Sequence, residues 1–237
     1  MRKQIFVVLD TETTKRNGLV FDAGWTSIDR QGNHYGKGSY LFRDILVKDD
    51  PFYRHKIANY WEMAWQHDVR PITFSNFRDR FNRHLNKLRK MNCEPIICAY
   101  NAAFDTRQLS LTCTTMLGKR FLTKPVKLLD IWDAWASSCP KRYIAEMSAA
   151  GNIRSRAEDV YRYEMRLPDF EEAHTGYEDT KIEAQILLKV LARKQSLPIV
   201  THPSQFESHP WKKVQERVNK NINPTKEEIR NNFAPAS

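Results

Sequence analysis

Two carboxylates near the start of the chain are spaced so that they can act together. Asp10 directly follows the apolar run at residues 5–9, and Glu12 lies two residues further on. In an extended backbone, residues i and i+2 project to the same face, so both carboxylates can converge. Two hard oxygen donors at a strand end suit Mg²⁺ or Mn²⁺. Taken alone, such a pair is more often two solvated acids or caps of the following segment.

Acids and a histidine recur at two later places. Asp105 follows the apolar run at residues 96–100 and, taken alone, is an ordinary helix N-cap. His174 stands just before a helix expected over residues 177–194, and Asp179 lies in its first turn. The helix dipole favours a carboxylate there in any case. A single histidine in front of a helix is more often a surface residue than a catalyst.

The three motifs gain meaning from their order. Asp-x-Glu follows the first strand, Asn101-x-x-Phe-Asp105 follows a later one, and His174-x4-Asp179 opens a late helix. This order resembles that of the DnaQ-like, DEDD-family 3′–5′ exonucleases, in the subclass that carries histidine (DEDDh), over roughly residues 5–192. The subclass with tyrosine has that residue four positions before the last Asp, where this chain has Thr175.

The resemblance implies a fold and a set of roles. The fold would be α/β, a ribonuclease H-like mixed sheet of about five strands flanked by helices. Asp10, Glu12, Asp105 and Asp179 would correspond to the acids that hold two divalent cations, Mg²⁺ or Mn²⁺, and His174 to the general base. Such a cation pair polarises a phosphodiester, and an imidazole with an ordinary pKa of about 6.5 can accept a proton from water.

The reaction implied by the resemblance is hydrolysis at nucleic-acid 3′ ends with release of nucleoside monophosphates. We expect DNA, preferably single-stranded, because the sequence is similar to stand-alone exonucleases of bacterial and phage DNA metabolism. That similarity also favours the cytoplasm of a bacterial or phage-infected cell. An RNA 3′-end trimming exoribonuclease is the alternative, since the motifs serve both. A non-catalytic nucleic-acid-binding or polymerase-partner module would have a broken acid set, whereas all five matching positions are present.

Other residues are weaker candidates for contacts with the substrate. Thr11 and Thr13 flank the acids, where the backbone of such folds can approach the terminal nucleotide. Asn101 matches the asparagine of the family and is expected to order the loop that holds Asp105. The aromatic segment at residues 52–67 fits either stacking of unpaired bases or a packed flap over the sheet.

Apolar patterning predicts the elements that must position these residues. Strands are expected at residues 5–9, 24–29, 38–47, 96–100 and 126–129, and helices at 74–90, 106–117 and 177–194. The first three strands fit an antiparallel meander with a turn at residues 29–33. Thr175-x-x-Glu178 reads as a capping box for the last helix.

The charge surplus points to a polyanionic partner. The formal net charge is +10, of which residues 74–90 hold +5 and residues 193–237 hold +4. On the first of these segments, Arg83 and Lys87 lie opposite the apolar stripe. That face is either simply solvated or guides a nucleic-acid backbone toward the acids.

Several classes of protein and site are excluded or disfavoured. No Walker A or GxGxxG pattern occurs, so a phosphate-binding loop of those kinds is not expected. The apolar run at residues 5–9 is far too short for a membrane span, and no membrane partner is expected. The four cysteines are irregularly spaced without CxxC, which favours reduced thiols over a zinc site.

The end of the chain differs in texture from the rest. Prolines interrupt it at positions 198, 203, 210, 224 and 235, around two short amphipathic pieces. We therefore expect an exonuclease domain at residues 1–194 and a C-terminal extension at residues 195–237. The extension could pack on the domain or tether a polymerase or another replication or repair partner.

Overall fold

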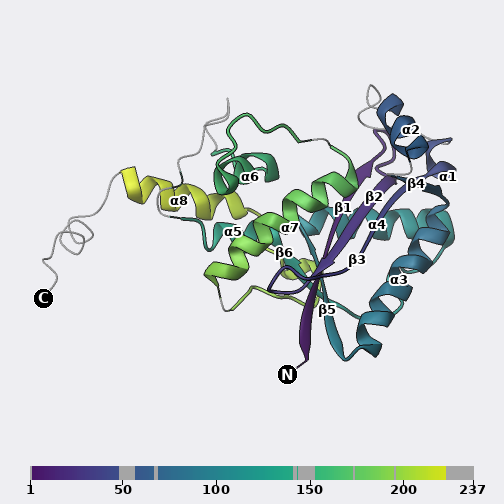
Figure 1. Ribbon diagram of the computed structural model, residues 1–237, viewed down its shortest axis with the longest axis horizontal. Coiled ribbons are helices and arrows are strands. Elements are labelled where there is room, and N and C mark those ends of the chain that lie inside the picture. Colours follow the sequence, from purple (N-terminus) through teal and green to yellow (C-terminus); the bar gives the residue numbers. More distant parts are fainter. Residues whose placement is uncertain are drawn as a thin grey trace, which may run out of the picture.

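The computed structural model describes residues 2–47, 57–66, 69–140, 143, 153–172, 174–194 and 196–222. A six-stranded mixed sheet forms its centre, in the order β4-β3-β2-β1-β5-β6 (Figure 1). The strands are β1 (Lys3–Thr13), β2 (Val20–Ile28), β3 (His34–Phe42), β4 (Arg70–Ile72), β5 (Cys93–Ala99) and β6 (Lys127–Asp130). The helices are α1 (Arg43–Leu46), α2 (Ile57–Trp65), α3 (Phe74–Lys90), α4 (Ala102–Leu117), α5 (Ile131–Ala136), α6 (Ala157–Met165), α7 (Gly176–Arg193), the 3₁₀ turn η2 (Pro203–Gln205) and α8 (Pro210–Ile222).

The predicted meander and the mixed sheet are confirmed. β1 pairs antiparallel with β2, and β2 with β3, whereas β5 and β6 run parallel to β1. The turn after β2 is held by Asp29, whose Oδ1 accepts 2.9 Å hydrogen bonds from the backbone N–H of Gln31 and Asn33. The sixth strand, β4, pairs parallel with β3.

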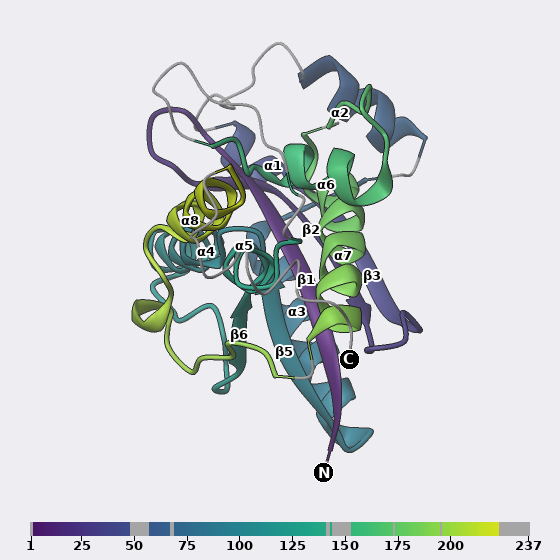
Figure 2. The same ribbon diagram turned by 90° about the vertical axis from the view of Figure 1, so that its left-hand side faces the viewer.

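Helices cover both faces of the sheet. Ile5, Val7 and Leu9 of β1 pack in one core with side chains of α3 and α4, whereas Phe6 and Val8 pack in a second core with α5, α7 and α8. Figures 1 and 2 show α7 and α3 on opposite sides of β1. β1 is therefore buried on both faces, as its continuous apolar run predicts.

Several predicted boundaries were wrong. β1 continues to Thr13, so Asp10 and Glu12 lie inside the strand, because pairing with β2 continues to its end. β3 stops at Phe42, and the chain turns into α1 where a strand was expected. β5 includes Pro95, which lies ahead of the segment that pairs with β6.

Two helix starts also differ from the sequence pattern. α4 begins at Ala102, four residues earlier than expected, so Asp105 lies within its first turn and does not cap it. The capping box expected at the start of α7 does not form. The hydroxyl of Thr175 makes no capping hydrogen bond, and Glu178 instead forms an ion pair with Lys181 Nζ at 2.6 Å.

Part of the C-terminal segment packs on the rest of the molecule. Val200 forms an antiparallel bridge with Leu128 of β6, and Val214 of α8 is buried in the core that contains α7. Arg217 donates 2.7 Å hydrogen bonds to the carbonyls of Ser137 and Cys139. The second amphipathic piece, within residues 223–237, and part of the aromatic segment at 52–67 lie outside the described residues.

Across the described ranges, no helix is both long and apolar enough to cross a bilayer.

Candidate active site

The first two acids project from β1 toward α7. Asp10 pairs with Gly24 and Glu12 with Asp22 in the antiparallel register of β1 and β2. Side chains alternate along a strand, so these acids lie on the face of Phe6 and Val8, which α7 covers. The convergence expected from the i, i+2 spacing follows from this geometry.

The third acid comes from the start of α4. Asp105 is 2 % exposed, and its Oδ1 accepts a 2.7 Å hydrogen bond from Thr11 Oγ1. Asn101, at the N-cap position, adopts the left-handed conformation with φ of 68°, which turns the chain from β5 into the helix. The bond from Thr11 joins the end of β1 to the start of α4. The Thr11 hydroxyl, a predicted substrate contact, is therefore directed toward Asp105.

The fourth acid depends on a close approach of α7 to the sheet. A Cβ atom added to Gly176 would lie 2.7 Å from the backbone nitrogen of Gly24 and 3.1 Å from the backbone oxygen of Asp10. The backbone N–H of Gly176 donates a 2.7 Å hydrogen bond to Asp22 Oδ2. Asp179, one turn later, is thereby held over β1 and is 4 % exposed.

His174 lies at the mouth of the same group. Single ligand atoms of Glu12, His174 and Asp179 all lie within 4.8 Å of one another. The backbone of His174 has φ of 53°, and its carbonyl accepts a 3.2 Å hydrogen bond from the hydroxyl of Tyr60. Its Nδ1 lies 3.6 Å from a carboxylate oxygen of Glu172, and 36 % of the side chain is exposed. The imidazole can therefore meet both the acids and a solvent-borne substrate.

Burial and mutual repulsion dominate the electrostatics of the acids. Burial raises the pKa of Asp10 well above its ordinary value, and the nearby carboxylates of Glu183, Asp105, Asp179 and Glu12 raise it further. Burial also raises the pKa of Asp105 to about 7, against the hydrogen bond from Thr11, which lowers it. Carboxylates clustered in this way are more stable with bound protons or cations than in the free ionised form.

One acid of the cluster, Glu183, was not predicted from the sequence. It lies on α7 one turn after Asp179 and is 2 % exposed. Burial and the charge of Asp105 raise its pKa well above the ordinary value, while a hydrogen bond from the backbone of Tyr100 opposes this. Among the described residues, its Oε2 has no hydrogen-bond partner. The i, i+4 spacing places Glu183 on the same face of the helix as Asp179, and this was the available signal in the sequence. An acid at that spacing on a helix does not by itself indicate a site.

The donor set fits divalent cations. Carboxylate oxygens, here from β1, α4 and α7, are the ligand type that Mg²⁺ and Mn²⁺ prefer. The buried Oε2 of Glu183, which has no hydrogen-bond partner among the described residues, adds a further carboxyl oxygen beside them. Asp10, Glu12, Asp105 and Asp179 could hold such ions, with His174 at the rim.

Other acids near this edge have structural tasks. Asp130 accepts 2.9 Å hydrogen bonds from the backbone N–H groups of Ala102 and Asp133, so it joins the starts of α4 and α5. Burial raises its pKa to about 6.

Thr13, a predicted substrate contact, lies where the register between β1 and β2 shifts, and its side chain is half-buried.

The structure does not bring Arg83 and Lys87 to the acids. Both are exposed on α3, on the side of the sheet opposite α7. His84, between them, contacts Ser27 at 2.7 Å, and Ser27 pairs with Val7, three residues before Asp10.

Another group of cations lies beside α7, the helix that carries Asp179. A polar cavity of about 450 Å³ is lined by Lys37, Arg70, Lys181, Tyr177 and other residues of β3 and α7. Lys37 and Lys181 lie 5.4 Å and 4.7 Å from the centre of the Tyr177 ring. These cations come from three distant segments, so no run of charge in the sequence could reveal them.

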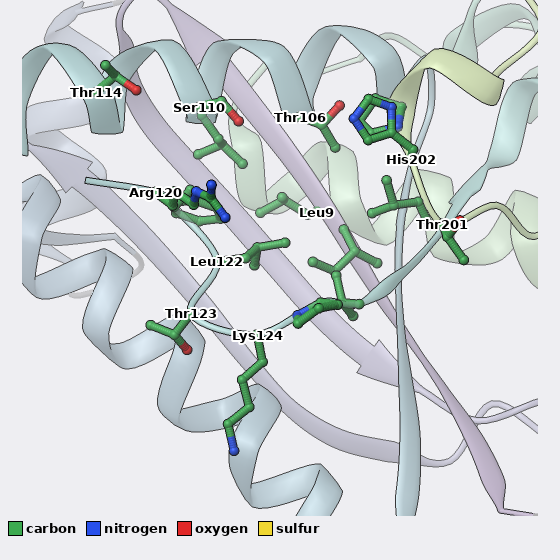
Figure 3. Close-up of a pocket in the computed structure, with 17 residues that line it drawn as sticks. Leu9, Thr106, Ser110, Thr114, Arg120, Leu122, Thr123, Lys124, Thr201 and His202 are labelled. Carbon is green, nitrogen blue, oxygen red and sulfur yellow. The ribbon is translucent and has the colours of Figure 1, made fainter. Parts of the chain in front are cut away.

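A further cavity is separate from the acids. Figure 3 shows it between α4, the segment after Gly118 and the segment around His202, with a volume of about 460 Å³. Ser110 and Thr106 of α4 face it with Leu9 and Leu122, and none of the described residues that line it is acidic.

Comparison with known proteins rests on structures. No protein-family model and no curated protein sequence matches this chain. A structure of Exonuclease X with 5′ overhanging duplex DNA is 15 % identical, covers 79 % of this chain and 91 % of that one, and has a TM-score of 0.46. A structure of a 3′-exonuclease that specifically recognises the 3′ end of a histone mRNA stem-loop is 12 % identical. It covers 87 % of this chain and 94 % of that one, with a TM-score of 0.56. A full-length 3′-exonuclease is 14 % identical and covers 88 % of this chain and 91 % of that one, with a TM-score of 0.59.

The chain has the ribonuclease H-like fold of these 3′-exonucleases. This confirms the fold that the motif order implied. The ribonuclease H-like sheet is extended at one edge by the short strand β4, beyond the five strands that were expected.

Proposed function

We propose that the protein is a metal-dependent 3′–5′ exonuclease that releases nucleoside monophosphates. The observation that carries this proposal is that Asp10 interacts with the carboxylates of Glu12, Asp105 and Asp179, while His174 lies beside Glu12 and Asp179. The similarity in fold to solved 3′-exonucleases supports it. Incidental surface acids would not share a site in which burial raises the pKa of Asp10 and Asp105 and the neighbouring carboxylates raise that of Asp10 further.

In this proposal the four acids hold two divalent cations, Mg²⁺ or Mn²⁺. When bound, such ions polarise the scissile phosphate and stabilise the leaving 3′ oxygen. His174 accepts the proton of the attacking water, and Glu172, 3.6 Å from its Nδ1, orients the imidazole. Asp22 and Tyr60 hold the backbone of the segment that carries His174.

We propose DNA, with single strands preferred, as the substrate. The cations of Lys37, Arg70 and Lys181, which line one cavity with Tyr177 of α7, support binding of a phosphate backbone. RNA 3′-end trimming is the second candidate, favoured by similarity to the 3′-exonuclease that recognises a histone mRNA stem-loop.

A polymerase or another replication or repair protein is the proposed macromolecular partner, with the extension at residues 195–237 as its contact. Val214 is buried and Arg217 hydrogen-bonds to Cys139, which leaves the exposed side of α8 for that contact.

The test uses three oligonucleotides labelled at the 5′ end: single-stranded DNA, duplex DNA and single-stranded RNA. With Mg²⁺ or Mn²⁺ we expect a ladder of labelled products that shortens with time, abolished by EDTA and by Asp10→Asn. Immediate release of the labelled terminal nucleotide would show the opposite polarity, and full activity of Asp10→Asn would overturn the proposal. The relative rates on the three probes decide between DNA and RNA.

A further inference from the structure

A cavity of about 560 Å³ lies beyond the ends of β5 and β6. Its lining includes Tyr100, Asn101, Trp132, Arg154, Arg156 and Trp211. Tyr100 directly follows β5, Trp132 lies in the first turn of α5 after β6, and Trp211 comes from α8. Ligands of open α/β sheets bind at this carboxyl edge of the strands.

The aromatic wall of the cavity is held rigidly. The rings of Tyr100 and Trp132 stack, with centroids 5.9 Å apart and planes 16° from parallel. The Tyr100 hydroxyl donates a 2.5 Å hydrogen bond to the Ser155 carbonyl, and Trp132 Nε1 donates a 3.0 Å hydrogen bond to Ser155 Oγ. Because both polar groups are satisfied inside the protein, the wall offers a ligand carbon surface and π-electrons.

The cavity adjoins the acid cluster. Val8 of β1 pairs with Cys98 of β5, so two residues further on Asp10 and Tyr100 lie at the same level of the sheet. The backbone of Tyr100 hydrogen-bonds to Glu183, and Asn101 begins the helix that carries Asp105. A ligand spanning a few ångströms can therefore touch both places.

Cations complete the lining. Arg154 and Arg156 contribute guanidinium groups, and Arg156 keeps 66 % of its side chain exposed while paired with Asp159 at 3.1 Å. Lys212 Nζ lies 5.8 Å from the centre of the Trp211 ring. Flat aromatic surface beside arginines matches a nucleotide, whose base stacks and whose phosphate accepts charged hydrogen bonds.

We propose that this cavity binds one unpaired nucleotide of the substrate strand, close to the scissile end. The proposal rests on the proposed function and deepens it, because a base must leave a duplex to enter the cavity. It makes Trp211 of the C-terminal extension a substrate-binding residue. It also gives a structural basis for a preference for single strands.

Binding can be measured separately from hydrolysis. Full-length protein carrying Asp179→Asn, without divalent cations, is titrated with fluorescent oligodeoxythymidine and, separately, with oligouridine. We expect Trp211→Ala to weaken binding by about tenfold and Trp211→Phe to weaken it much less, since stacking accounts for the contact. Lys189→Ala, on the exposed side of α7, is the control for an unrelated surface change.

A second measurement uses protein without the tryptophan substitutions, so it does not depend on whether those variants fold. The same probes, each with one 5-iodouracil near the 3′ end, are bound to this protein and irradiated, and the crosslinked peptide is sequenced. Crosslinks to Trp211 or Trp132 support the proposal. Unchanged affinity of Trp211→Ala, or crosslinks confined to other segments, would overturn it. Because neither readout needs cleavage, absence of exonuclease activity would remove the proposed function and leave this result interpretable.

Discussion

Gly176 lies directly against Gly24. A Cβ atom on Gly24 would lie 2.2 Å from the backbone nitrogen of Tyr177, far inside van der Waals contact. No side chain fits between the start of α7 and β2, and this contact is what brings Asp179 to Asp10. The geometry of the site is therefore set by two residues that carry no chemistry of their own.

Gly24→Ala is expected to push α7 away from the sheet. We predict a loss of about 1–3 kcal/mol in the free energy of unfolding, as for overpacked cores. A larger relative loss in metal-dependent hydrolysis should follow, because Asp179 moves away from Asp10. Denaturant melts and kcat on the same preparation check both. Gly118→Ala, with open space around its Cβ, should cost about 1 kcal/mol through its positive φ and leave activity intact.

The metal-free protein is expected to lose stability as pH rises from 6.5 to 8. Asp105 has a pKa of about 7 in the folded protein against about 4 when unfolded, so folding takes up a proton in between. Stability from this group is greatest below pH 4 and declines as pH rises toward 7, so the last part of it is lost between pH 6.5 and 8. Asp22 and Asp130, at about 6, have the same sign, while His84, lowered to about 4, acts with the opposite sign below 6.5.

Thermal midpoints across this pH range, with and without Asp105→Asn, isolate the contribution of Asp105. The slope should flatten in the variant. An identical slope in both proteins would show that Asp105 is ionised already at pH 6.5. Mn²⁺ should reverse the trend, because it competes with protons for the same oxygens.

Replacement of His174 and of the acids should have different consequences. Asp10→Ala or Asp179→Ala removes a candidate cation ligand, so hydrolysis and the Mn²⁺-induced thermal shift should both disappear. His174→Ala should lower the rate by about 10²–10⁴-fold, the usual contribution of a general base. Its Mn²⁺-induced shift should stay largely intact. Loss of that shift in His174→Ala would make the histidine a ligand.

Glu183→Gln removes one buried ionisable carboxyl group from a crowded cluster. We expect the metal-free thermal midpoint to rise by about 2–4 °C, corresponding to roughly 1 kcal/mol in a chain of this size. The Mn²⁺-induced shift should shrink, since less repulsion remains to be relieved. Glu216→Gln, on the exposed side of α8, should change neither quantity. A lower midpoint in Glu183→Gln would instead indicate a structural role for its carboxylate.

Two basic surfaces can be compared by salt dependence. Lys37→Ala with Arg70→Ala should lower the slope of log affinity against log salt by about 1–1.5, if each cation meets one phosphate of a single strand. Charge reversal of Arg83 and Lys87 would lower it if the exposed face of α3 guides the strand. We expect the first pair to dominate because its cavity adjoins Glu178 and the start of α7.

The sequence predicted those features that local periodicity determines. The stripe from Phe74 to Leu88 gave α3 with its observed bounds, and the period of two placed Asp10 and Glu12 on one face. β4 was missed because three residues are too short for a periodic signal.

Features that depend on contacts between distant segments could be recognised only once the fold was known. Glu183 became visible as part of the cluster only when α7 was placed on β1. The same holds for Lys37 and Arg70, whose segments meet through pairing of β3 with β4. The capping box of Thr175 failed although its pattern was present, because α7 starts against β2 instead of in solvent.

The bridge between Val200 and Leu128 has a consequence for the state of the protein in solution. β6 is the last strand of the sheet, and Leu128 and Val200 exchange two backbone hydrogen bonds of 2.9 Å there. An unprotected outer strand offers a row of open donors and acceptors to a second molecule and so invites aggregation. By occupying that position, the segment around Val200 interrupts the row and hinders strand-to-strand self-association.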